Sequence, residues 1–100
     1  MVFHDIDELK LNEYVNKDYV LLDFYANWCG PCKMLSPVLD ELSKIKNIDI
    51  YKINVDQHPS IARGYGVMTI PTVVLYRNGL QIKKHIGYLS LNDLIEWIDA

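Results

Sequence analysis

The 100-residue sequence has little cysteine, little excess charge and no long apolar run. Ten Lys and Arg residues against 13 Asp and Glu give a net charge of −3, which provides no basic surface for nucleic acid. No apolar stretch approaches the roughly 20 residues of a membrane-spanning helix. The first residues, Met1–Asp5, lack the charged and apolar regions of a signal peptide. These absences predict a cytoplasmic protein that binds neither nucleic acid nor membrane.

Repeats, low-complexity tracts and long linkers are also missing, and half of the residues are apolar. This length and composition predict one domain, residues 1–100, with its own core, and we expect a monomer. The three histidines, His4, His58 and His85, lie far apart without the spacing of metal ligands, so no metal site is predicted. There is no G-x-G-x-x-G motif and no room for a nucleotide domain, so we expect no bound cofactor.

The two cysteines stand together in Trp28-Cys29-Gly30-Pro31-Cys32. An apolar run, residues 19–26, precedes them, and a helical pattern begins near Cys32. At such a junction the first thiol meets the unpaired N–H groups and the positive end of the helix, which favour a thiolate. The pair therefore predicts a redox site. Half of a zinc site and a small buried hydrophobic residue are the alternatives, and zinc usually needs four ligands.

The hydrophobic pattern alternates between strands and helices. The strands are expected at Val2–Ile6, Tyr19–Ala26, Asn47–Val55, Thr72–Tyr76 and Gln81–Ile86, the last two joined by an Asn78-Gly79 hairpin turn. The helices are expected from Asp7 to Asn16, after Cys32, from Pro59 to Gly64 or Gly66, and after Ser90. The order βαβαβαββα predicts an α/β fold, in which a central mixed five-stranded sheet has four helices on its two faces.

Two helical faces can be assigned from this pattern. In the first helix, Leu9, Tyr14 and Val15 are expected among the buried positions. In the second, the spacing i, i+3, i+4, i+7 puts Leu35, Val38, Leu39 and Leu42 on one face.

A carboxylate, Asp23, interrupts the apolar run that precedes the cysteines. Apolar burial disfavours its charged form and should raise its pKa, which suits a general acid or base. The alternative is a structural pair with a lysine, and Lys52 on the neighbouring strand is the expected supporting partner. The two interpretations are compatible.

Several motifs in order make the chain resemble the thioredoxin family over nearly its whole length. They are Asp23-Phe-Tyr-Ala-Asn-Trp-Cys-Gly-Pro-Cys-Lys33, Pro37, Lys52-Ile-Asn-Val-Asp56, Ile70-Pro71-Thr72, Asn78-Gly79 and Gly87. The chain departs from the family at Tyr25, where Trp is frequent, and in a short N-terminal segment. The resemblance implies a thioredoxin fold and a protein-disulfide reductase. Gly30-Pro31 is the family's own dipeptide, whereas oxidising relatives usually carry a histidine there.

The resemblance, together with the helix-end argument, assigns the chemistry. Cys29 is expected to be the exposed nucleophile, and Cys32, less exposed inside the first turn, to resolve the mixed disulfide. The resemblance puts Asp23 beneath Cys32 as the acceptor of its proton. It also implies that Ile70-Pro71 is a cis peptide facing the disulfide, which would leave the Ile70 backbone free to pair with a substrate strand. The alternative for Pro71 is an edge-strand proline that only blocks pairing.

The expected substrate-binding surface consists of Trp28, Gly30, Pro31, Ile70, Pro71 and Gly87. Ordinary packing remains the alternative for Trp28, and a simple turn is the alternative for Gly87.

The resemblance also implies partners: a thioredoxin reductase that uses NADPH, and disulfide-containing clients such as reductases and peroxidases. Two other functions stay open. One is a disulfide isomerase or oxidant, which a measured redox potential would distinguish. The other is a structural subunit with an idle cysteine pair, which a Cys29→Ser, Cys32→Ser double variant would reveal.

Overall fold

The computed structural model describes all residues from Met1 to Ala100. Its elements follow the predicted order, with one added 3-10 turn near the N-terminus. They are β1 (Val2–Phe3), the 3-10 turn (Glu8–Lys10), α1 (Leu11–Val15), β2 (Tyr19–Tyr25), α2 (Gly30–Ile45), β3 (Asp49–Asn54), α3 (Pro59–Gly64), β4 (Thr72–Arg77), β5 (Leu80–Ile86) and α4 (Leu91–Asp99).

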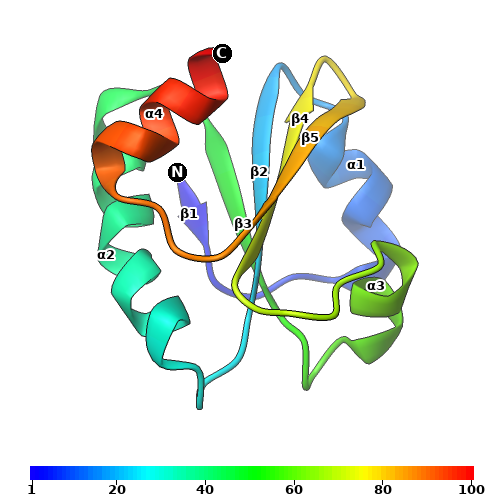
Figure 1. Cartoon of the computed structure of the whole chain (residues 1–100). Coiled ribbons are helices and arrows are strands. Elements are labelled where there is room, and N and C mark those ends of the chain that lie inside the picture. Colours follow the sequence, from blue (N-terminus) through cyan, green and yellow to red (C-terminus); the bar gives the residue numbers. More distant parts are fainter.

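The five strands form one mixed sheet in the order β1-β3-β2-β4-β5. β3 lies parallel to both β1 and β2, whereas β4 runs antiparallel to β2 and β5. Helices α2 and α4 cover one face, and α1 and α3 cover the other (Figure 1). The predicted α/β architecture is confirmed. None of the helices combines the length and apolar character that crossing a bilayer requires.

Alternating side chains of the strands divide the core into two layers. Leu21 and Ile50 pack against Leu35, Leu39 and Leu42 of α2 and against α4. The other face buries Leu22, Phe24 and Ile53 against α1 and α3. Central strand β2 is therefore covered on both faces, as its almost wholly apolar sequence predicts. On the helix face predicted for α2, three leucines are buried and Val38 is half-buried.

The N-terminal segment differs most from expectation. The first strand is only Val2–Phe3, and the helix predicted from Asp7 begins as a 3-10 turn. Asp7 does cap it, accepting a hydrogen bond from the Leu9 backbone N–H at 3.0 Å. The prediction that Leu9 is buried is wrong, since it is 94% exposed. Leu9 lies in the 3-10 turn, which has about three residues per turn, so its side chain does not share the face on which Val15 of α1 is buried.

The β4–β5 hairpin turns at Asn78-Gly79, as the sequence predicts. Both residues have positive φ, 53° for Asn78 and 79° for Gly79, as a tight hairpin turn requires. A Cβ at Gly79 would also meet the Asn16 side-chain oxygen at 2.8 Å. The positive φ therefore favours glycine at this position, and a Cβ there would require the Asn16 side chain to shift.

Gly79→Ala should lower the free energy of unfolding by about 1–2 kcal/mol, because an L-residue is disfavoured in the left-handed region. Gly64→Ala is the matched control, since a Cβ there meets nothing within 4 Å. The control should leave stability unchanged or raise it by up to about 1 kcal/mol. Urea unfolding of both variants measures the difference, and equal stabilities would contradict the strained turn.

Candidate active site

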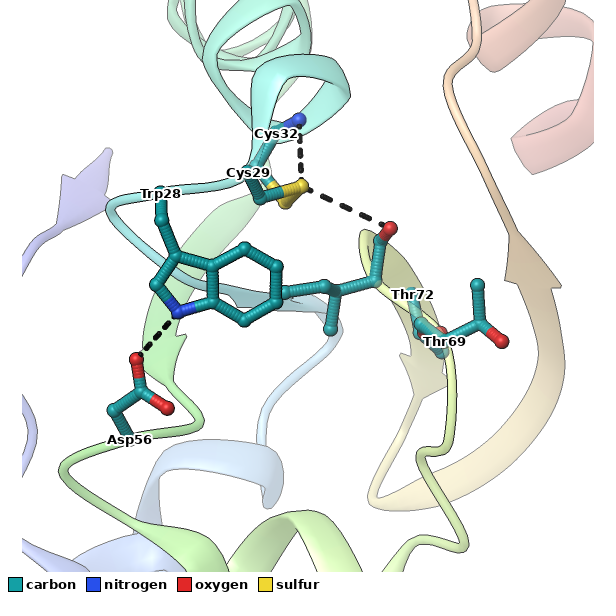
Figure 2. The surroundings of a disulfide bond; sticks show 7 residues. Trp28, Cys29, Cys32, Asp56, Thr69 and Thr72 are labelled. Atoms are coloured by element: carbon teal, nitrogen blue, oxygen red, sulfur yellow. Dashed lines mark hydrogen bonds between the residues drawn. A yellow bond between two sulfur atoms is a disulfide. The ribbon is translucent and has the colours of Figure 1, made fainter.

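The two cysteines lie where β2 ends and α2 begins, and they form a disulfide with 5.3 Å between their Cα atoms. Cys29 has extended backbone angles and is the N-cap of the 16-residue helix. Its Sγ accepts a hydrogen bond from the Cys32 backbone N–H at 3.2 Å (Figure 2). Pro31 in the first turn has no N–H to leave unpaired. The helix end therefore offers its positive pole and an N–H donor to the Cys29 sulfur.

The sequence predicts that Cys29 is more exposed than Cys32, but the structure buries the two cysteines equally. Cys29 is 5% exposed and Cys32 is 4% exposed. Both pack in a small cluster with Ala26, against which the side chain of Ile70 also lies. The expectation of an exposed Cys29 is wrong for this oxidised form, because the disulfide ties the first sulfur to a buried one. Attack on the pair must therefore come past the residues that border it.

Trp28 borders the disulfide and is 71% exposed. Its indole Nε1 donates a hydrogen bond to Asp56 Oδ2 at 2.9 Å (Figure 2). The sequence analysis gives no role to Asp56, the last residue of the Lys52–Asp56 motif, which lies just beyond the end of β3. β2 and β3 are parallel, so their C-terminal ends lie at the same end of the sheet. This arrangement could have predicted that Asp56 lies near Trp28. The indole is thus held in place and not packed into the core.

The segment before β4 faces the disulfide. Ile70-Pro71 is a cis peptide, as expected, and the Ile70 carbonyl oxygen lies 3.8 Å from Cys29 Sγ. A disulfide sulfur carries no proton, so this contact becomes a hydrogen bond only in the reduced thiol. Neither the N–H nor the carbonyl of Ile70 takes part in a backbone–backbone hydrogen bond. An unpaired peptide unit therefore stands beside the sulfur.

Two contacts fasten this segment. Thr72 Oγ1 donates to the Thr69 carbonyl at 2.6 Å, and the Gly87 N–H donates to the Pro71 carbonyl at 2.8 Å. Gly87 has a φ of 105°, which favours glycine. The structure thus joins Gly87 to the Pro71 segment.

Asp23 lies on β2 and is 1% exposed. Asp23 lies two residues after Leu21, so both side chains point to the side of the sheet that α2 covers. Its Oδ1 has no hydrogen-bond partner. Burial raises the pKa of this carboxyl to about 7, and the Lys52 charge opposes the rise. The predicted direction of the pKa shift is confirmed.

Lys52 occupies the position paired with Asp23 on β3. Its Nζ nevertheless donates to Ser36 Oγ on α2 at 2.8 Å and lies 5.0 Å from the centre of the Tyr25 ring. No ion pair joins Lys52 to Asp23. The sequence located the lysine correctly and missed Ser36. A signal existed, because Ser36 lies one helical turn after Cys32 on the same face of α2.

A cavity of about 180 Å³ opens beside Cys32. Residues from β2, β3 and α2 line it, namely Tyr25, Ala26, Asn27, Cys32, Lys33, Ser36 and Lys52. Nowhere in the structure do three or more His, Cys, Asp or Glu side chains gather as metal ligands. The cavity thus joins Cys32 of the sulfur pair to Ser36 and Lys52, and Lys52 is the cross-strand neighbour of Asp23.

Comparison with known proteins places this geometry in one group. A family model described as Thioredoxin matches residues 2–100. Thioredoxin of Rickettsia felis is 48% identical over 82 residues, covering 80% of this chain and 78% of the relative. Thioredoxin of Rickettsia prowazekii is 41% identical and covers 99% of this chain and 97% of its own length.

Solved structures agree with the sequence relatives. A mutant thioredoxin from Halobacterium salinarum matches with a TM-score of 0.91 at 35% identity, over 98% of this chain and 88% of that chain. A chain from a structure of thiol resolution in yeast mitochondrial 1-Cys peroxiredoxin via glutathione/thioredoxin systems matches with a TM-score of 0.86 at 31% identity. The match covers 98% of this chain and 93% of that chain.

Asp23→Asn should stabilise the oxidised protein above neutral pH. The carboxyl pKa is about 7 when folded and about 3.9 when unfolded, so protonated Asp23 stabilises the fold below pH 4. That stability is lost as pH rises through 7. Asparagine does not titrate, so its advantage should grow across this window to at most roughly 4 kcal/mol at pH 8.

Urea unfolding at pH 4 and pH 8 checks this expectation. Asp40→Asn serves as the control, because Asp40 is exposed on α2 and its replacement should have the same small effect at both pH values. A loss of stability in Asp23→Asn at pH 8 would show that the charged carboxylate supports the fold.

Proposed function

Because the chain belongs to the thioredoxin family and is a thiol–disulfide oxidoreductase with a Cys29–Cys32 redox pair, we propose that Cys29 attacks client disulfides and Cys32 resolves the intermediate. The protein is a disulfide reductase of the thioredoxin type. The observation that carries the assignment of roles is the position of Cys29 as N-cap of α2, with the Cys32 N–H donating to its sulfur. A thiolate is stabilised there more than at Cys32.

The reaction transfers two electrons in two exchanges. The Cys29 thiolate attacks one sulfur of a client disulfide, forms a mixed disulfide and expels the other client sulfur as a thiolate. Cys32 then loses its proton and attacks Cys29 Sγ, and the second client thiolate leaves. The client gains two electrons and ends as a dithiol, whereas the chain ends with the Cys29–Cys32 disulfide.

Asp23 is the proposed acceptor of the Cys32 proton. A general base works best when its pKa lies near the working pH, and burial raises the pKa of Asp23 to about 7. The carboxyl points to the face of the sheet that α2 covers, and Cys32 lies in the first turn of that helix. Lys52 is its proposed supporting residue, because its charge opposes the rise in that pKa.

Client binding is proposed for the residues that border the disulfide. The exposed Trp28 ring offers apolar contact, and Gly30 and Pro31 present little side-chain bulk. Ile70 offers its unpaired N–H and carbonyl to an extended client strand, as in strand addition. Pro71 and Gly87 hold that segment against the site through the 2.8 Å hydrogen bond between them.

The proposal extends to partners and setting. Family membership supports the proposal that the clients are disulfide-containing proteins, including peroxidases and reductases. It also supports re-reduction of the chain by a thioredoxin reductase that draws on NADPH. We infer a monomer of one domain, residues 1–100, acting in the cytoplasm. A disulfide reductase requires a compartment in which its cysteines are returned to thiols.

In the reduced protein, alkylation at neutral pH should modify Cys29 faster than Cys32, on the order of tenfold or more, because only the first thiol caps the helix. Peptide mass spectrometry of briefly labelled samples gives both rates. Labelling in urea is the control, since unfolding removes the helix end and should make the rates similar. Equal rates in the folded protein would overturn the nucleophile assignment.

Asp23→Asn should slow resolution of the mixed disulfide by roughly 100-fold, because it removes the proton acceptor. A thionitrobenzoate mixed disulfide on Cys29 releases a coloured thiol as Cys32 attacks, so absorbance reports this step alone. The control adds Asp23→Asn to a Cys32→Ser background, in which only attack by Cys29 is measured and should change little. Unchanged release in Asp23→Asn would end the general-base proposal.

A further inference from the structure

A hydroxyl on α2, that of Ser36, accepts a hydrogen bond from the Lys52 ammonium at 2.8 Å. Lys52 is the cross-strand neighbour of Asp23, and the side chains at both positions face α2. The ammonium nevertheless donates to Ser36 Oγ and lies over the Tyr25 ring, while Asp23 Oδ1 remains without a partner. A buried carboxylate next to a buried lysine would ordinarily be paired with it. In the structure the cation is therefore paired with Ser36 and not with the carboxylate.

We propose that Ser36 is a positioning residue that keeps Asp23 a proton acceptor by holding the Lys52 ammonium toward α2 and away from the carboxylate. The inference rests on the proposed role of Asp23. It deepens that role by naming the residue that controls the charge next to the acceptor.

Electrostatics explains why the position of one cation matters so much. A positive charge within about 4–6 Å of a carboxylate favours its ionised form and makes it a weaker base. The Lys52 charge lowers the pKa of Asp23 against the rise that burial causes. Moving that ammonium from Ser36 to the free Oδ1 would shorten the distance between the charges in a region of low dielectric.

Two other ionisable side chains, His85 and Lys33, come from the elements packed around Asp23. Strand β4 places Val73 opposite it, and His85 lies beyond Val73 on β5, where its ring packs on Trp97 of α4. Helix α2 contributes the Cys29–Cys32 disulfide, Ser36 and, at the wall of the cavity, Lys33. Ser36 is thus the polar partner that competes with Asp23 for Lys52.

The test follows the Asp23 carboxyl by carbon NMR titration. In Ser36→Ala, Lys52 loses its acceptor and should turn to Asp23, so the pKa of Asp23 should fall by about one pH unit. Ser36→Thr keeps a hydroxyl at the same place and should leave the pKa close to that of the parent protein. An unchanged or higher pKa in Ser36→Ala would overturn the proposal.

A second pair of variants shows whether the effect passes through the lysine. Lys52→Met should raise the pKa of Asp23, and adding Ser36→Ala to Lys52→Met should change it no further. A fall of similar size in the absence of Lys52 would mean that Ser36 acts on Asp23 by another route, and this result would also overturn the proposal.

The kinetic consequence separates this inference from the general-base proposal. In Ser36→Ala, the pH at which thionitrobenzoate release reaches half of its maximum should move down by the same amount as the carboxyl pKa. If the carboxyl pKa falls while the rate profile stays fixed, Ser36 positions Lys52 as proposed but Asp23 is not the proton acceptor. If neither the carboxyl pKa nor the rate profile moves, the positioning role is wrong. The Asp23→Asn variant still decides the role of the carboxyl independently.

Discussion

The site depends on a strand, β2, that is hydrogen-bonded to neighbours on both edges and buried on both faces. If such a strand shifted by one residue, every one of its side chains would move to the opposite layer of the core. Its last residues therefore reach the edge of the sheet at a fixed place, where Cys29 caps α2. The same register puts Asp23 two residues before the end of the strand, on the face that α2 covers. One packing constraint thus fixes both the sulfur pair and the carboxyl.

That carboxyl is energetically unfavourable in its charged form. An ionisable group at 1% exposure, with one oxygen unpaired, would be replaced by an apolar residue if packing alone mattered. The fold tolerates it because the surrounding leucines and valines supply ample apolar burial, and because the neutral acid avoids most of the penalty. The feature that weakens the core is also the one that brings the pKa of Asp23 near neutral pH. Stability and the proposed proton transfer therefore make opposite demands on Asp23.

The sequence predicted the parts of the molecule that local patterns control. The order of strands and helices along the chain, the Asn78-Gly79 turn, the Asp7 cap and the junction at Cys29 all follow from short segments whose chemistry has few solutions. The sequence did not predict the Ser36 partner of Lys52, because a lysine can reach several acceptors and the choice depends on how α2 packs over β3. The exposure of Leu9 and the equal burial of the cysteines likewise depend on helix type and on disulfide state.

The unpaired Ile70 peptide gives the proposed mode of client binding a physical consequence. Backbone groups carry no information about client side chains, so hydrogen bonds to them select an extended conformation and not a sequence. Selectivity must then come from the side chains around the disulfide. Trp28 is fixed by Asp56, whereas Met68, 96% exposed in the same loop as Ile70, has no such anchor. The proposed binding mode therefore takes a fixed contact surface from the indole and an adaptable one from the thioether two residues before Ile70.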